Sequence, residues 1–248
     1  MINLKSDREL TLMRDAGRVV AEALEEVAKA VRPGVTTGEL NSLVEDLLQQ
    51  RGARAAFKGY YGYPESICAS VNHEIVHGIP GLKTLMDGDI ISIDIGAEIN
   101  GYYGDAAVTL PVGNIDEVSQ KLIDVTARCL KAGIEQCQKG KRLTDISFAV
   151  QDNAESAGFS VVKEYVGHGI GRAMHEDPQV PNFGRPGRGL RLSPGLVLAI
   201  EPMINVGGSW TEVLADNWTV VTKDRTRSAH FEHTVAVTER GPEVLTRR

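Results

Sequence analysis

The second half of this chain repeats the plan of the first at a spacing of about 107 residues. The segments MDGDIISIDIGA at 86–97 and SPGLVLAIEPMI at 193–204 align so that Asp94 matches Glu201. The segment VHGIPG at 76–81 also resembles VGHGIG at 166–171, at a shorter spacing of 90 residues. Each match alone is weak, but together they indicate two copies of one helix–helix–strand–hairpin unit. Two such halves, each with one sheet face to bury, predict an α+β fold with a pseudo-two-fold antiparallel sheet covered by helices.

Helix signals mark both copies. The segments SDRE at 6–9 and TTGE at 36–39 each fit a capping box, in which a Ser or Thr and a Glu cap the first turn. The predicted helices cover about residues 7–32, 37–51, 117–140 and 144–158, the last capped by Thr144. No linker rich in proline or serine separates the copies, so we expect one domain over residues 1–248, with pseudo-repeats at about 6–111 and 116–240.

The predicted hairpin at 88–110 carries two aspartates, although aspartate is a poor strand former and is seldom buried without a partner. With a two-residue Asn-Gly turn at 100–101, Asp94 lies opposite Ala107 and Asp105 lies opposite Gly96. The two aspartates then share one face as diagonal neighbours, about 7 to 8 Å apart at the backbone. A turn shifted by one residue would separate them. The alternative is that one or both face solvent on an edge hairpin.

The second copy supplies Glu201 and Glu232 at equivalent points. Four carboxylates in one sheet would repel one another and could not all stay ionised without cations, and two divalent ions would balance their charge. His168, which stands between glycines in VGHGIG, is the natural nitrogen ligand beside them, although a lone histidine there also fits a structural role. Such a set suits Mn²⁺, Fe²⁺, Co²⁺ or Zn²⁺ better than Mg²⁺ or Ca²⁺.

Composition excludes several other functions. A formal net charge of −6 argues against a general binder of nucleic acid or anionic membranes. No apolar run approaches the roughly 18 residues of a membrane span, and the polar start MINLKSDREL has no signal-peptide core. The three cysteines have no disulfide-framework spacing. We therefore expect a cytoplasmic protein with reduced thiols.

Five segments, in this order, resemble the type I, bacterial-style methionine aminopeptidases of the pita-bread metallopeptidases. They are NHEIVHGIP, SIDIGAEINGYYGDAAVT, GHGIGRAMHEDPQVPNF, AIEPMI and FEHTVAVT. The resemblance covers essentially the whole chain, with neither an N-terminal extension nor the long insert of type II relatives. It implies the pita-bread fold, a pseudo-two-fold α+β domain.

The resemblance also implies a dinuclear centre with two divalent metal ions per chain, Co, Mn, Fe or Zn. Its implied metal ligands are Asp94, Asp105, His168, Glu201 and Glu232. A water or hydroxide bridging the metals would be the nucleophile, and Glu201 would also be the proton shuttle.

Two further histidines, His77 and His175, match family residues that face the substrate peptide and help to polarise the scissile carbonyl. The alternative for both is a supporting structural role. His73, His230 and His233 match no catalytic role, and we expect them to be exposed or structural.

An aromatic cluster matches the pocket that receives the methionine side chain, although by itself such a cluster would be typical of plain core. The matched residues are Tyr60, Tyr63, Cys68 and Trp218. Three neighbours depart from the family pattern: Phe57 replaces a common cysteine, Met174 a common aromatic residue and Tyr61 a frequent histidine at the rim. These departures change the shape of the pocket and leave the chemistry untouched.

The implied activity is removal of methionine from peptides and nascent proteins whose second residue is small. The implied partners are chains with a free N-terminal methionine and, transiently, the ribosome, and we expect a monomer without nucleic-acid or membrane partners. One alternative is an X-Pro aminopeptidase or prolidase-like enzyme of the same fold, which usually carries an additional N-terminal domain. The other is a non-catalytic binding module, which typically loses ligands, whereas this chain has lost none.

Overall fold

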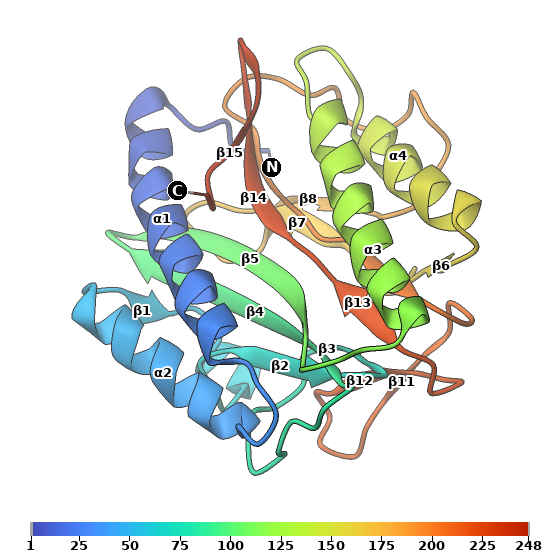
Figure 1. Cartoon of the computed structure of the whole chain (residues 1–248). Coiled ribbons are helices and arrows are strands. Elements are labelled where there is room, and N and C mark those ends of the chain that lie inside the picture. Colours follow the sequence, from blue (N-terminus) through green and yellow to red (C-terminus); the bar gives the residue numbers. More distant parts are fainter. Residues whose placement is uncertain (1, 248) are drawn as a thin grey trace.

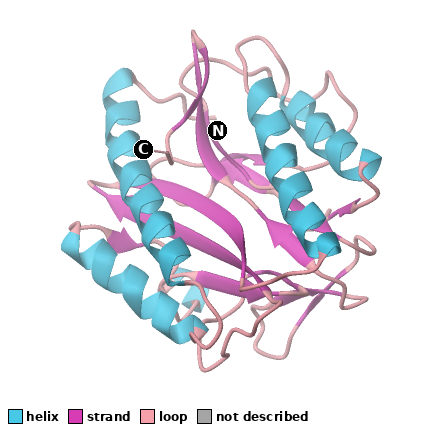
Figure 2. Cartoon of the chain, in the orientation of Figure 1, coloured by secondary structure: helices cyan, strands magenta, loops and turns pink. Residues whose placement is uncertain are grey.

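Four helices lie across one side of the strands in the computed structural model, which describes residues 2–247 (Figures 1 and 2). The helices are α1 (Asp7–Ala30), α2 (Thr37–Gln50), α3 (Glu117–Gln136) and α4 (Leu143–Ser156), with a short 3-10 helix at Tyr60–Gly62. The capping boxes at 6–9 and 36–39 are confirmed, because Ser6 and Thr36 each accept a hydrogen bond from the backbone of the paired glutamate.

The strands pair only in antiparallel fashion within the described residues. One sheet contains β1 (Arg54–Ala55), β2 (Cys68–Val71), β4 (Ile90–Ile99) and β5 (Tyr102–Pro111). A second contains β7 (Gly167–Gly169), β8 (Glu176–Val180), β9 (Val197–Ile200), β14 (His233–Thr238) and β15 (Gly241–Val244). Two smaller sheets contain β6 (Ser160–Val161), β10 (Met203–Asn205) and β13 (Ser228–His230), and β3 (Glu74–Val76), β11 (Thr211–Val213) and β12 (Val220–Thr222).

The β4–β5 hairpin has the register that its turn predicts. Asp94 pairs with Ala107 and Asp105 pairs with Gly96. The turn residues Asn100 and Gly101 have φ angles of 54° and 79°. Both are positive, as a type I′ turn requires. Because side chains alternate along a strand, both aspartates lie on one face of this hairpin.

The other face of β4 packs against the helices. Ile91, Ile93 and Ile95 are fully buried in one apolar cluster with Val20 and Val27 of α1. Alternation along the strand therefore sends the isoleucines into the core and Asp94 to the opposite side, which explains how an aspartate fits within a buried strand.

In the second copy, the two strands that correspond to β4 and β5 are not joined by a tight turn. Its two central strands, β9 and β14, pair directly, but residues 203–230 with four further strands lie between them in the chain. Glu201 directly follows β9 and Glu232 directly precedes β14, so both glutamates lie at the ends of strands.

A seam between β5 and the chain around β14 joins the two copies. The backbone N–H of Glu232 donates to the Ala107 carbonyl over 2.9 Å, and the Ala107 N–H donates in return over 3.3 Å. The Thr234 hydroxyl donates to the carbonyl of Asp105 over 2.8 Å and accepts from its N–H over 3.0 Å. Figure 1 shows β5 and β14 in the middle of the molecule. The carboxylates of the two copies meet at this seam.

One predicted helix start is wrong in detail. Thr144 lies inside α4, whose first turn is capped from Arg142, where the backbone N–H donates to Asp145 over 2.8 Å. The Thr144 hydroxyl donates to the carbonyl of Arg188 over 2.9 Å instead. In the first copy, the Thr37 hydroxyl donates to the carbonyl of Gly81 over 3.2 Å. The two threonines therefore tether their helices to a loop 44 residues downstream in both copies.

None of the helices within residues 2–247 is long and apolar enough to cross a membrane.

Candidate metal centre and substrate pocket

Four carboxylates line one cavity of about 400 Å³, two from each side of the seam. Asp94 and Asp105 come from the β4–β5 hairpin, and Glu201 and Glu232 come from the ends of β9 and β14. Three of their oxygens are buried without a hydrogen-bond partner, namely Asp94 Oδ1, Asp105 Oδ1 and Glu232 Oε1. Buried carboxylate oxygens without partners are rare, because each has lost its hydration without compensation.

Without a bound cation, these four carboxyl groups are difficult to ionise. Burial, and then the neighbouring carboxylates, raise the pKa of Asp94, Glu201 and Glu232 well above the ordinary values. Burial also raises the pKa of Asp105 to about 7. Like charges in a low-dielectric site disfavour the ionised forms, whereas a bound cation would favour them.

His168 reaches the carboxylates because two glycines let its strand pass close to its neighbours. A Cβ atom at Gly167 would lie 2.3 Å from the carbonyl oxygen of Ala199, and one at Gly169 would lie 2.2 Å from that of Asp177. Only glycine at these two positions allows the backbone to pass this close.

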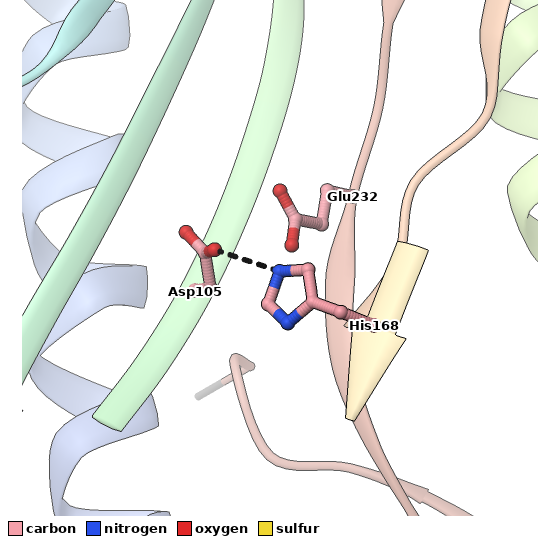
Figure 3. Close-up of side chains that lie close together, drawn as sticks. All are labelled: Asp105, His168 and Glu232. Carbon is pink, nitrogen blue, oxygen red and sulfur yellow. Dashed lines mark ion pairs between the residues drawn. The ribbon is translucent and has the colours of Figure 1, made fainter. Parts of the chain in front are cut away.

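The tautomer of His168 is set by its own chain. Its Nδ1 lies 2.8 Å from the carbonyl oxygen of Gly169, which can only accept, so Nδ1 carries the proton and Nε2 is left with a lone pair. Nε2 lies 3.7 Å from Asp105 Oδ2 and 3.6 Å from Glu201 Oε1, too far for hydrogen bonds. In Figure 3, His168 from β7, Asp105 from β5 and Glu232 point toward one another.

The donor set fits divalent cations. Asp105, His168 and Glu232 offer ligand atoms within 4.8 Å of one another, as do Glu201, His230 and Glu232. Burial lowers the pKa of His168 to about 4, so its ring is neutral near pH 7, as a metal ligand must be. Imidazole and carboxylate together are typical ligands of Zn²⁺, Co²⁺, Fe²⁺ and Mn²⁺.

His77 and His175 also face the cavity. The His175 ring lies 4.2 Å from that of His168 between centroids, and its Nδ1 lies 2.9 Å from the hydroxyl of Tyr60. His77 has a φ of 58°, a left-handed backbone conformation that few residues other than glycine adopt and that recurs at functional sites. Burial lowers the pKa of each ring to about 4, so both are neutral near pH 7.

An apolar wall completes the cavity. The rings of Tyr63 and Trp218 meet edge to face at 5.1 Å, and the Tyr63 hydroxyl donates to backbone carbonyls at Ile67 and Gly78, both over 3.0 Å. Cys68 is a buried free thiol, and burial raises its pKa, so it lines the wall as a neutral group. This wall of the cavity, which begins beside Asp94 where Cys68 pairs with it, is therefore suited to an apolar side chain.

Every site residue expected from the sequence lines this cavity. The lining consists of Phe57, Tyr60, Tyr61, Tyr63, Cys68, His77, Asp94, Asp105, His168, Met174, His175, Glu201, Trp218 and Glu232. Phe57 and Met174 are buried in the wall, whereas Tyr61 is exposed at the rim.

His230 is the residue that sequence reasoning missed. The sequence predicts an exposed or structural role for it, as for His73 and His233; it is buried, and its Nε2 lies 3.8 Å from Glu201 Oε2. Burial, and then His77, lower its pKa to about 3. The signal that could have found it is its place two residues before Glu232, because alternate residues of an extended chain share a face. His233 behaves as expected, with Nδ1 2.9 Å from the Thr246 hydroxyl.

Comparisons with known proteins agree with this geometry. Residues 11–239 match the model of metallopeptidase family M24. The chain is 55% identical to methionine aminopeptidase 1 of Bacillus subtilis over 247 residues, which cover 100% of both chains. It is 47% identical to methionine aminopeptidase 1 of Mycobacterium tuberculosis, covering 98% of this chain and 94% of the relative.

Solved structures confirm the expected pita-bread α+β fold. The crystal structure of methionine aminopeptidase from Thermotoga maritima superposes with a TM-score of 0.99 at 47% identity, and the match covers 100% of each chain. Prolidase from Pyrococcus furiosus superposes with a TM-score of 0.81 at 22% identity, and only 65% of that chain is covered. The prolidase match therefore shows the shared fold alone.

Proposed function

The chain belongs to metallopeptidase family M24, and from that premise we propose how its buried centre removes methionine from the N-terminus of a peptide. The chain is a metal-dependent aminopeptidase, and N-terminal methionine removal is the activity that its full-length relatives support. The observation that carries our proposal is the cavity, in which four carboxylates and three histidines face an apolar aromatic wall.

We assign two divalent ions, Co, Mn, Fe or Zn, to Asp94, Asp105, His168, Glu201 and Glu232. The unpartnered carboxylate oxygens and the lone pair of His168 support this assignment. When bound, such ions lower the pKa of a water molecule and polarise the scissile carbonyl.

Proton transfer falls to Glu201 in this proposal. Its carboxylate lies in the cavity beside His168, where it can accept a proton from the attacking water and pass it to the leaving amine. Its backbone is held while it does so, because the Asn182 amide donates to the Glu201 carbonyl over 2.9 Å.

Two further histidines that line the cavity, His77 and His175, bind the peptide. If the Tyr60 hydroxyl donates to Nδ1 of His175, the ring proton sits on Nε2, where it can donate to the scissile carbonyl. His77 is neutral as well, and its ring N–H can donate to a carbonyl oxygen of the substrate peptide. Both rings thereby stabilise charge that develops on oxygen without adding a cation to the site.

The apolar wall sets the specificity. Tyr60, Tyr63, Cys68 and Trp218, with Phe57 and Met174, form a pocket for the methionine side chain. A flexible thioether gains dispersion and sulfur–aromatic contacts against such rings. The wall itself contains a flexible thioether, that of Met174, so the pocket can adjust its shape to the methionine of the substrate.

Methionine release from defined peptides tests the activity. The purified chain is loaded anaerobically with Mn²⁺, Co²⁺, Fe²⁺ or Zn²⁺ and incubated with Met-Ala-Ser and, separately, with Gly-Pro. We expect methionine from Met-Ala-Ser with at least one metal, slower release when a bulky second residue replaces Ala, and no cleavage of Gly-Pro. Cleavage of Gly-Pro alone would favour the prolidase-like alternative, and inactivity with all four metals would contradict our proposal.

The setting of the reaction is also proposed. We place the enzyme in the cytoplasm, as a monomer acting on nascent chains transiently near the ribosome, and the three free, buried cysteines fit a reducing compartment. We further propose that the chain is one catalytic domain of two pseudo-repeats, because the threonine tethers and the paired carboxylates recur in both halves. Sedimentation with and without ribosomes, in the presence of a methionine-initiated nascent chain, tests the first of these proposals.

A further inference from the structure

His230 is held rigidly beside the carboxylates by its backbone. It ends β13, only two residues before Glu232, and is 2% exposed. Its N–H donates to the Thr109 hydroxyl over 2.8 Å, and that hydroxyl donates to the His230 carbonyl over 2.8 Å. Thr109 belongs to β5, so the seam between the two copies fixes the backbone from which this ring projects.

The inner nitrogen of the ring has no partner. His230 Nε2 is buried without a hydrogen bond, 3.8 Å from Glu201 Oε2 and 3.9 Å from Glu232 Oε2. A buried ring nitrogen aimed at two carboxylates but bonded to neither resembles the unpartnered carboxylate oxygens of the same cavity.

The spacing matches that of a metal ligand. His168, already assigned to the centre, stands 3.6 and 3.7 Å from its two carboxylates, nearly the same separation as His230. Such distances exceed the roughly 3.2 Å limit of a good N–H···O hydrogen bond. They remain below the separation of about 4 Å that two donors can have when each lies about 2.0 to 2.2 Å from one ion.

We propose that His230 Nε2 is a sixth ligand of the centre and binds one divalent cation together with Glu201 and Glu232. The three residues offer ligand atoms within 4.8 Å of one another, and both glutamates are shared with His168: Glu232 belongs to the Asp105–His168 set, and Glu201 has Oε1 nearest His168 and Oε2 nearest His230. Each of the two cations then has one imidazole ligand. This inference rests on the proposed function only in that the centre binds two cations.

A nitrogen ligand on each ion changes the metal preference. Imidazole suits Zn²⁺, Co²⁺ and Fe²⁺, whereas Mn²⁺ and Mg²⁺ accept all-oxygen sites. Replacement of His230 by Gln should therefore weaken binding of the second Co²⁺ ion by at least about 10-fold and weaken Mn²⁺ binding less.

Counting the bound imidazoles tests the proposal directly. Each imidazole bound to paramagnetic Co²⁺ gives one strongly shifted, exchangeable N–H proton signal in the NMR spectrum. With two Co²⁺ ions bound, we expect two such signals from the unmodified protein and one each from His168→Gln and His230→Gln. The matched control is His233→Gln, a neighbour of Glu232 whose ring pairs with Thr246, and it should keep both signals.

The alternative outcome is equally sharp. If the unmodified protein with two Co²⁺ ions shows a single signal that His168→Gln removes and His230→Gln leaves, His230 is not a ligand. Calorimetric titration gives the second readout, since unchanged affinity of His230→Gln for the second Co²⁺ would also overturn the proposal. Methionine release measured on the same Co²⁺ sample separates the two proposals, because the signal count does not depend on turnover.

Discussion

At the scale of single residues, Asp105 joins the two halves of the centre, because its neighbours include Asp94, His168 and Glu232. We expect Asp105→Asn to lower kcat/KM by about 100-fold or more, since an amide cannot supply the charge that holds a cation. The free energy of unfolding of the metal-free protein should change by no more than about 1 kcal/mol, because the amide removes a buried charge while keeping the shape.

Steady-state kinetics and chemical denaturation of the same metal-free and metal-loaded samples measure both effects. Asp124→Asn, an exposed change on α3, is the control and should alter neither quantity. A fully active Asp105→Asn enzyme would refute the assignment of Asp105 to the metals.

Tyr60 is expected to act through His175. Without the hydroxyl 2.9 Å from Nδ1, nothing selects the tautomer that presents an N–H to the substrate. Tyr60→Phe should therefore lower kcat/KM about 10-fold, equivalent to one hydrogen bond, and should leave metal affinity unchanged. Tyr61→Phe, on an adjacent ring that is 85% exposed, is the matched control. Equal activity of the two variants would remove Tyr60 from the mechanism.

Local sequence was sufficient to place some site residues and insufficient for others. The Asn100–Gly101 turn fixes the register of its own hairpin, so the shared face of Asp94 and Asp105 could be predicted. For His230 the sequence indicates only a shared face with Glu232, two residues later; its proximity to Glu201 depends on how β13 pairs with β10, and no short motif encodes that pairing.

At the scale of elements, one buried ion pair positions the loop that carries Met174 and His175. Lys5 Nζ lies 2.6 Å from Glu176 Oε2, and the two side chains are only 6% and 13% exposed. Glu176 also accepts the backbone N–H of Arg172 over 2.8 Å. The segment before α1 therefore holds both ends of this loop.

We expect Lys5→Met to lower the free energy of unfolding by about 3 kcal/mol, because it leaves a carboxylate buried without its cation. The activity should fall as well, since His175 loses its support. Lys29→Met breaks an ion pair whose side chains are 67% and 44% exposed, and should change stability by less than about 1 kcal/mol. Equal effects of the two variants, measured by urea denaturation, would show that the Lys5 pair has no structural role.

The helix caps show where element prediction fails. Ser6 and Thr36 cap their helices as predicted, because the whole signal lies within four residues. Thr144 is also a residue type typical of a helix N-cap, although Ser147 rather than a glutamate follows three residues later, and its hydroxyl donates to the carbonyl of Arg188. A contact 44 residues away decided between two uses of the same side chain, and local propensity contains no information about it.

At the scale of the whole molecule, the repeat predicted that two pairs of carboxylates exist but not how they meet. The seam that joins them pairs β5 with the chain before β14, across more than 120 residues. In the second copy, residues 203–230 are inserted between β9 and β14. Glu201 and Glu232 therefore lie at strand ends rather than within strands. The resemblance to a known family supplied the ligand set that the repeat alone left open.

The charge of the centre links metal binding to the stability of the entire fold. In the metal-free protein, the pKa of Asp105 is raised to about 7 and those of Asp94, Glu201 and Glu232 are raised as well. A carboxyl whose folded pKa exceeds its unfolded value stabilises the fold at low pH, and this stability is lost as pH rises toward the folded pKa.

The histidines have the opposite effect in a lower pH range. The pKa of every histidine in the chain is lowered by burial from its ordinary value near 6.5. Their contribution to the stability of the fold therefore increases as pH rises toward 6.5 and stays constant above that pH. Between pH 4 and 6.5, the stability lost through the carboxyls offsets the stability gained through the histidines. Above pH 6.5 the carboxyls dominate the change, because the buried cysteine thiols, whose pKa values are raised as well, contribute only as pH approaches 8.

We therefore expect the Tm of the metal-free protein to fall between pH 6.5 and 8, whereas the metal-loaded protein keeps its Tm. Each carboxyl that is ionised only in the unfolded state removes about 1.4 kcal/mol per pH unit, which lowers the Tm by about 3 to 6 °C for a chain of this size. The gain in Tm on adding Mn²⁺ or Co²⁺ should widen over the same range, because bound cations displace fewer protons as pH rises. Calorimetric scans at pH 6.5, 7.25 and 8 would measure both trends, and a gain independent of pH would mean that these carboxyls are already ionised before metal binds.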